Sequence, residues 1–167
     1  MGAVVIDFQP TKFVPTNTSA AWVAMSGTST QTITTLTDNV LVDATLSCSL
    51  EAGATGEDIG IRLGISLDGG STYDYSVEGA SGYLMQNDEG ASSFARFRFD
   101  VRHVVAGTLT DDLIIKAEYS TNASYADTLD FLDVRGFAYE VPVISSGAGT
   151  SFTRLVGQPG QLLITGG

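Results

Sequence analysis

Residues 58–77 contain the pattern that most restricts the fold: a strand, a turn and a second strand. Apolar side chains take every second position of the first run, namely Ile59, Ile61, Leu63, Ile65 and Leu67. The turn 68–71 reads Asp-Gly-Gly-Ser, and its glycines supply the positive φ angles of a tight hairpin. Tyr73, Tyr75 and Val77 then continue the alternation. Because successive strand side chains point to opposite faces, one face should pack on a core and the other should point outward. The unit predicts antiparallel β structure.

Further strand patterns follow along the chain at spacings of roughly 8–12 residues, with turn signals between them, as is typical of a β-sandwich or barrel. The expected strands are 3–8, 21–25, 31–36, 40–50, 81–85, 94–104, 113–119 and 129–141. We also expect a polar loop over 86–92, a turn at Ala106-Gly107 and a β-bulge at Gly136. No segment keeps a 3.6-residue apolar period, so any helix would be a single turn. The sequence therefore predicts an all-β fold.

Three parts are expected along the chain. Residues 1–30 form an N-terminal arm with the first strands, 31–141 the β-sandwich body, and 142–167 a flexible C-terminal arm. The last part begins with a Ser/Gly-rich linker and then carries two short apolar runs, 152–156 and 162–164. Such a tail cannot bury its apolar side chains within itself. It either packs on its own domain as an edge strand or adds to a neighbouring molecule.

The charge balance excludes several partners. Nineteen acidic residues against eight basic ones give a net charge of −11, so phosphates of nucleic acids and anionic membranes would be repelled. This acidity serves either solubility or a partner-directed role. No apolar run approaches the length of a membrane helix, and the start of the chain does not read as a signal peptide. We expect a soluble protein that is synthesised in the cytoplasm of a host cell.

The residues that usually carry catalysis are scarce. The single cysteine, Cys48, lies on the apolar side of its strand and is expected to be a buried structural thiol. The single histidine, His103, has the inward parity of its strand and is expected to be structural. One His and one Cys cannot form a zinc site, and no phosphate-binding loop with a lysine is present. We therefore expect no enzyme activity and no cofactor.

Paired carboxylates are the one catalytic set that the sequence leaves open. In glycoside hydrolases two such groups act as acid and as base or nucleophile, and the same oxygens bind calcium. In an acidic chain, such pairs also arise by chance in loops. The candidates are Asp111-Asp112, Asp88-Glu89, Glu57-Asp58 and the group Asp127, Asp130 and Asp133.

Partner contacts have their own candidates. Three of the eight basic residues, Arg96, Arg98 and Arg102, lie on the outer face of one expected strand. They either pair with acidic residues of a neighbouring strand or form a subunit contact. Aromatic residues of the N-terminal arm and apolar residues of the C-terminal arm are further candidates, because such side chains dominate binding energy at interfaces. These are Phe8, Phe13, Trp22, Phe152, Leu155 and Leu163.

A resemblance can be named from three segments: 63–71 with its DGGS turn, the Phe97-Arg98-Phe99 strand and the closing strand 138–141. Over residues 40–141 the chain resembles the jelly-roll β-sandwiches of tailed-bacteriophage virion proteins, and among these the head decoration (cement) proteins. The resemblance implies an antiparallel jelly-roll sandwich with terminal arms. It also implies a homotrimer on the capsid exterior that contacts the major capsid protein and locks neighbouring subunits together. The family has no catalytic signature, so no site residues transfer.

The alternative is a carbohydrate- or receptor-binding β-sandwich module of a phage fibre or surface protein. Such a site would stack sugars on exposed aromatic rings. Tyr73, Tyr75, Tyr83 and Tyr125 are the candidates, although Tyr73 and Tyr75 also fit a core. In the decoration hypothesis, deleting 142–167 or 1–20 should weaken assembly while the body stays folded.

Overall fold

The fold is given by a computed structural model that describes residues 3–15, 21–51, 57–76, 85–87, 96–121 and 129–141. Within these, the side chains of 50–51, 57–58, 85–87, 96–99 and 129–131 are not described. All regular elements of the described residues are strands: β1 (Ala3–Phe8), β2 (Val23–Ala24), β3 (Thr30–Ile33), β4 (Asn39–Glu51), β5 (Glu57–Ser66), β6 (Asp74–Tyr75), β7 (Met85–Asn87), β8 (Arg96–Thr108), β9 (Leu113–Thr121) and β10 (Leu129–Glu140).

The strands pair in a nested order. β1 pairs with β10, β2 and β3 pair with β9, β4 pairs with β8, and β5 pairs with β6 and β7, all antiparallel. This is the pairing of one long hairpin. Two further contacts, β10 with β4 and β9 with β5, roll that hairpin into two sheets. Rolling of this kind defines a jelly roll, so the predicted all-β antiparallel sandwich of jelly-roll type is confirmed.

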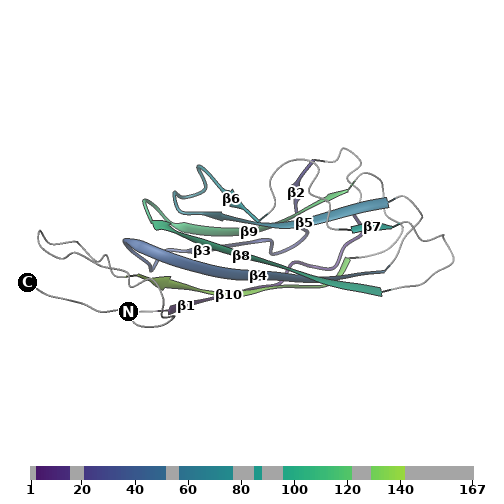
Figure 1. The fold of residues 1–167 in the computed structure, drawn as a ribbon, viewed down its shortest axis with the longest axis horizontal. Coiled ribbons are helices and arrows are strands. Elements are labelled where there is room, and N and C mark those ends of the chain that lie inside the picture. Colours follow the sequence, from purple (N-terminus) through teal and green to yellow (C-terminus); the bar gives the residue numbers. More distant parts are fainter. Residues whose placement is uncertain are drawn as a thin grey trace, which may run out of the picture.

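Two layers result, as Figure 1 shows. The four-stranded sheet has the order β1-β10-β4-β8, and the six-stranded sheet is built on β2-β9-β5-β6 with β3 and β7 at its sides. The core lies between them, where alternate residues of β4 (Val40 to Cys48) face alternate residues of β5 (Ile59 to Ile65) and are almost fully buried. Each valine, leucine or isoleucine among them stabilises the fold by roughly 1.5–3 kcal/mol. The two-residue period seen in the sequence therefore locates the core correctly.

The unit at 58–77 is confirmed as strand, turn and strand, with Gly64 opposite Tyr75 and Ile65 opposite Asp74. Gly69 and Gly70 have φ angles of 65° and 91°, as the turn requires. The expectation of a tight hairpin was wrong, because β5 ends at Ser66 and β6 begins only at Asp74. The wider loop closes around the Asp68 carboxylate, which accepts hydrogen bonds from the Thr72 backbone N–H, the Thr72 hydroxyl and the Ser66 hydroxyl.

Three local predictions need correction. The turn expected at Ala106-Gly107 is wrong, because β8 continues through both residues in register with β4. The bulge expected at Gly136 is also wrong: Gly136 pairs regularly with Ala44 and Ile6, and the irregularity of β10 lies between Asp130 and Asp133. The polar loop expected over 86–92 is wrong at its start, where Gln86 and Asn87 belong to β7.

The first strand is an integral part of the four-stranded sheet, since β1 pairs with β10 and buries Ile6 and Phe8. The division into 1–30, 31–141 and 142–167 stays a prediction. Residues 142–167, including Phe152, Leu155 and Leu163, lie outside the described residues. Among the residues that the structure describes, no helix of a length and apolarity suited to crossing a membrane occurs.

Candidate interaction surface

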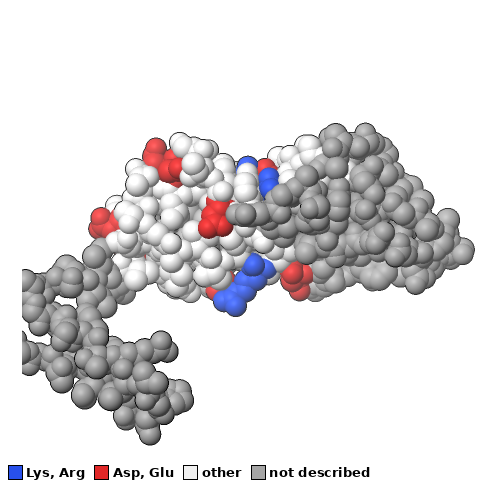
Figure 2. Space-filling model, turned by 45° about the horizontal axis from the view of Figure 1, so that its top comes forward, with Lys and Arg blue, Asp and Glu red and all other residues white. Residues whose placement is uncertain are grey.

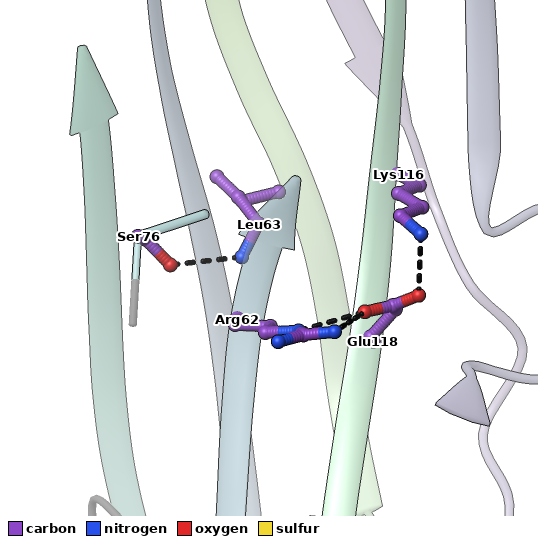
Figure 3. A network of polar contacts seen from close by, with 5 residues as sticks. All are labelled: Arg62, Leu63, Ser76, Lys116 and Glu118. Carbon is purple, nitrogen blue, oxygen red and sulfur yellow. Dashed lines mark hydrogen bonds and ion pairs between the residues drawn. The ribbon is translucent and has the colours of Figure 1, made fainter. Parts of the chain in front are cut away.

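The outer face of the six-stranded sheet holds an ion-pair network. Arg62 of β5 lies opposite Glu118 of β9, and its Nε and Nη2 atoms are 2.7 Å and 2.6 Å from Glu118 Oε2. Lys116 Nζ binds the other carboxylate oxygen, Oε1, at 2.7 Å (Figure 3). Burial by itself lowers the pKa of Lys116, but the hydrogen bonds to Glu118 and Tyr75 and the charges of the two groups together outweigh it, so the pKa is raised. The network therefore keeps three charges together on one sheet face.

Aromatic rings cover this network. The Arg62 guanidinium carbon lies 4.4 Å from the ring centroid of Trp22 and 3.6 Å from that of Tyr75. Lys116 Nζ lies 3.9 Å from the centroid of Tyr73, and the two tyrosine rings stack at 5.9 Å. A cation over an aromatic face gains roughly 0.5–2 kcal/mol, more when water is excluded. Tyr73 and Tyr75, two of the four rings proposed for sugar stacking, thus already contact cations of the same chain, while Tyr83 and Tyr125 lie outside the described residues.

The cover overturns one expectation from the sequence. The alternate face of β5 was expected to point outward, yet Gly60, Arg62, Gly64 and Ser66 are all buried, with Arg62 only 9% exposed. Gly64 permits the cover, because a Cβ atom there would lie 2.8 Å from Cε1 of the Tyr75 ring. Over β5 and β9, the outer face of the six-stranded sheet is thus covered by the chain's own side chains, whereas Thr30 and Thr32 of β3 are exposed.

The outer face of the four-stranded sheet is different. Its register aligns Val5, Phe137, Asp43 and Val104 in one row across β1, β10, β4 and β8. The next row aligns Ala3, Tyr139, Leu41 and Ala106. Val5 is 56% exposed, Val104 49%, Phe137 47% and Tyr139 40%. The apolar residues of these two rows, together with Val141, are called the apolar surface below. They are Ala3, Val5, Leu41, Val104, Ala106, Phe137, Tyr139 and Val141.

Ion pairs enter and border the apolar surface, because Asp43 lies between Phe137 and Val104 in its first row and Arg102 and Arg135 lie in the neighbouring row. Arg102 Nε and Nη2 bind the two carboxylate oxygens of Asp43 at 2.8 Å and 2.6 Å, and Arg135 binds Asp133 at 2.7 Å. The hydrogen bond from Arg102 holds the pKa of Asp43 below its usual range. For Arg102, the predicted pairing with an acidic residue of a neighbouring strand is confirmed. Figure 2 shows, on one side of the molecule, that charged side chains form small groups separated by uncharged surface.

The other residues predicted from the sequence to contact a partner lie in the core, in the aromatic cover or among the side chains that are not described. Phe8 is a core residue and only 6% exposed, so it offers no surface for a partner. Phe13 packs on Tyr119 with ring centroids 4.7 Å apart, and Trp22 belongs to the cover described above. Arg96 and Arg98 lie in β8, but their side chains are among those not described. The sequence therefore found Arg102 at the border of the apolar surface and missed the surface itself.

Among the side chains that the structure describes, the catalytic candidates do not converge. His103 Nε2 lies 3.3 Å from Asp74 Oδ1. This contact joins β8, the edge strand of the four-stranded sheet, to β6 of the six-stranded sheet. Cys48 is buried, as predicted, and burial raises the pKa of its thiol. Of the proposed carboxylate pairs, only the Asp111, Asp112 and Asp133 side chains are described. The described residues contain no group of three metal-ligating side chains.

A cleft of about 360 Å³ opens between β8 and the β5–β6 loop. Its lining combines apolar side chains with threonines and two carboxylates, those of Asp68 and Asp74. Both carboxylates already have partners within the chain: Thr72 and Ser66 bind Asp68, and His103 contacts Asp74. The cleft therefore presents no unpaired carboxylate as a general acid or base.

Comparisons with known proteins give little beyond the fold. No protein family model and no curated protein matches the sequence. Among solved structures, the chain is similar to one described as the structure of infectious bursal disease virus Gx strain, with 10% sequence identity and a TM-score of 0.41. The match covers 82% of this chain and 31% of that one, so the chain spans less than a third of the length of the protein it matches.

Proposed function

We propose that this chain is a non-enzymatic structural protein of a virus particle, which decorates and stabilises a bacteriophage capsid from the outside as a homotrimer. The observation that carries the proposal is the contrast between the two outer sheet faces. Aromatic side chains cover the part of one face that lies over β5 and β9, while the other face leaves Val5, Val104, Phe137 and Tyr139 exposed together. A β-sandwich that closes one face and leaves the other apolar is suited to binding a flat protein surface.

The composition of the apolar surface supports a protein partner. Interfaces combine an apolar, aromatic centre with a polar border in which arginine is enriched. Phe137 and Tyr139 supply the aromatic centre, with ring centroids 6.0 Å apart on the same face of β10. Arg102 and Arg135 supply the border, and each is already held by a carboxylate. Little side-chain entropy is then lost when a partner docks.

The charge of the chain indicates the chemistry of the partner. With a net charge of −11, association is fastest with a surface that is apolar at its centre and basic at its border. We take this partner to be the outer surface of a capsid subunit. The apolar surface spans only four strands, so each copy would bind weakly. Three linked copies would raise the overall affinity through avidity.

The proposal is tested by binding to capsids that lack decoration. The full chain is compared with Phe137→Ser, which removes the ring at the centre of the apolar surface. Val14→Ser is the matched control, because Val14 is also exposed, at 40%, but lies outside the strands of the four-stranded sheet. We expect Phe137→Ser to weaken binding by about tenfold or more, as for an aromatic hot spot, and Val14→Ser to leave it unchanged. Equal binding by all three chains would contradict the proposal.

The trimer is tested separately by light scattering on the same three chains. The parent chain is expected at three times its 17.5 kDa mass, either free or after release from the capsid. A monomer in both states would remove the trimer from the proposal. Capsid binding would remain open to the first test.

A further inference from the structure

We propose that the free edge of β1 is a strand-pairing site for a second copy of this chain, and that the Gln31 side chain holds this site closed. A strand at the edge of a sheet presents backbone N–H and C=O groups to which another extended chain can add. Three observations carry the inference: the position of β1, the hydrogen bonds that Gln31 makes to it, and the residues that a second copy would bring opposite it.

β1 lies at the edge of the four-stranded sheet. Among the described strands of that sheet it pairs with β10 alone, through all its residues from Ala3 to Phe8. Along an antiparallel strand, successive residues direct their backbone N–H and C=O groups to alternate sides. Every second residue of β1 therefore turns these groups away from β10 and toward the open side of the sandwich.

Gln31 of β3 supplies hydrogen-bond partners on that open side. Its Oε1 atom accepts a hydrogen bond from the Asp7 backbone N–H at 3.0 Å, and its Nε2 atom donates one to the Val5 carbonyl at 3.2 Å. One side-chain amide thus satisfies a backbone donor and a backbone acceptor, as a neighbouring strand would. Because β3 belongs to the six-stranded sheet, the same side chain also joins the two sheets at this side of the sandwich.

The pairing site on β1 is short. Directly after β1 the chain turns to another part of the molecule, where Pro10 forms a bridge with Gly27 and the Thr11 N–H donates to the Ser26 carbonyl at 2.8 Å. The site therefore consists of the six residues of β1. The two groups that Gln31 binds lie on either side of Ile6, near the middle of this strand.

A second copy of β1 fits this edge by symmetry. Two identical strands can pair antiparallel about a twofold axis, and an axis at Ile6 brings Val5 of each copy opposite Asp7 of the other. The Asp7 N–H of each copy then donates to the Val5 carbonyl of the other. These are the same two groups that Gln31 binds in the single chain, so the intramolecular contact and the pairing of two copies exclude each other.

The charges at this edge also permit a second copy. In the twofold register each Asp7 faces a valine rather than another carboxylate, so no like charges lie directly opposite. Arg135 lies next to Asp7 on β10 and balances its charge. The net charge of −11 therefore does not concentrate at the edge of β1. What keeps two copies apart at this edge is the Gln31 amide.

The inference is independent of the proposed function. It concerns the edge of the four-stranded sheet rather than its outer face, and its test needs only the isolated chain. The mass of the parent chain tests the proposed trimer. The difference in mass between parent and variant tests the closed edge, whatever the mass of the parent is.

Gln31→Val is the test variant, because valine favours a strand but cannot form hydrogen bonds to β1. Thr32→Val is the matched control: it adds a valine at the next residue of the same strand, on its exposed side. Light scattering compares both with the parent from low micromolar to near millimolar protein concentration. We expect the mass of Gln31→Val to rise toward twice that of the parent, and Thr32→Val to behave as the parent does.

Hydrogen exchange shows whether the edge of β1 is responsible. In dilute Gln31→Val the Asp7 amide should exchange about tenfold faster than in the parent, because it has lost its hydrogen bond. At high concentration its protection should return. The Ile6 amide, which faces β10 by the alternation of the strand, is the internal control and should stay protected throughout.

A third variant adds Asp7→Pro to Gln31→Val. Proline is tolerated in an edge strand where the N–H faces away from the sheet, so this change removes only the pairing group. We expect it to abolish the association. The proposal is overturned if Gln31→Val keeps the mass of the parent at every concentration, if Thr32→Val associates equally, or if the association survives Asp7→Pro. An Asp7 amide whose exchange does not respond to Gln31→Val would overturn it as well.

Discussion

Arg62 and Glu118 lie directly opposite each other on β5 and β9 and form an ion pair with almost no contact with solvent. Their side chains are 11% and 9% exposed, and the closest contact is 2.6 Å. A buried pair of this kind adds little net stability, but removing one partner leaves an uncompensated charge. Substitutions that remove only one charge of this pair should therefore destabilise the fold, whereas substitutions that remove both should cost less.

Glu118→Gln should destabilise the fold by about 3–5 kcal/mol, because it leaves Arg62 and Lys116 without their shared carboxylate. Urea denaturation would measure the loss. The double variant Arg62→Met/Glu118→Leu should lose less than the single variant, since only Lys116, which also lies over the Tyr73 and Tyr75 rings, is then left without its carboxylate. Asp43→Asn breaks the exposed pair with Arg102 and serves as the control, with an expected loss of about 1 kcal/mol or less. A loss of that size for Glu118→Gln would contradict the buried-pair interpretation.

Gly136→Ala tests the regular register of β10. A Cβ atom at Gly136 would lie 2.8 Å from Cα of Ala44 and would also clash with the Asp43 carbonyl, both of which are backbone groups of β4. We expect a loss of about 1–3 kcal/mol, as for overpacking in a close-packed region. Gly107→Ala is the matched control, because its new Cβ would meet only Cδ1 of Leu67, the end of a flexible side chain. Thermal unfolding measures both variants. Equal losses of stability in Gly136→Ala and Gly107→Ala would show that the close backbone contact at Gly136 does not determine the loss.

Asp68 should make the stability depend on pH in the acid range. The hydrogen bonds from Thr72, aided by that from Ser66, lower the pKa of Asp68 from 3.8 to about 2. A carboxyl whose folded pKa is lowered stabilises the fold fully above its unfolded pKa, and this contribution is lost as the pH falls through the folded pKa. The contribution should therefore disappear between about pH 4 and pH 2.

Asp68→Asn provides the measurement. Its urea midpoint should lie below that of the parent chain at pH 6, and the two midpoints should converge as the pH approaches 2. Thr72→Val should behave in the same way, because it removes the hydroxyl that contributes most to the shift. A constant difference between parent and variant at all pH values would assign the effect to packing instead.

Phe137→Ser should separate stability from association. The side chain is half-exposed, so the free energy of unfolding should change by no more than about 0.5–1 kcal/mol. Capsid binding should nevertheless fall, as argued for the proposed function. Denaturation of the isolated variant checks the first part. A large loss of stability would mean that Phe137 acts in folding, and the binding result would then need a milder variant such as Phe137→Leu.

Most of the strands could be predicted from the sequence, because the alternation of apolar and polar residues that indicates a strand lies within the strand itself. Alternation along residues 40–50, 59–67 and 113–119 requires no knowledge of the rest of the chain. The cover of the six-stranded sheet could not be predicted in this way, since Trp22 reaches Arg62 from a distant segment and Tyr75 from the strand paired with β5. Arg62 reads as an outward residue until those rings are placed over it.

The apolar surface was missed for a related reason. Val5, Val104 and Phe137 come from three strands, and only the pairing register aligns them. One signal was nevertheless present in the sequence. Residues 137–139 are apolar on both parities, so part of that strand had to expose apolar side chains outside the core. Phe8, expected at a contact, has the opposite parity in its strand and lies in the core.

The position of β10 has a consequence for the order of folding. β10 lies between β1 and β4, so among the described strands β1 has no other partner in its sheet. During synthesis, the first strand must therefore wait until more than a hundred further residues have left the ribosome. Contacts of such sequence separation slow folding and leave strand edges open in the meantime. We expect the four-stranded sheet to form last and to depend most on chaperones while the chain is being made.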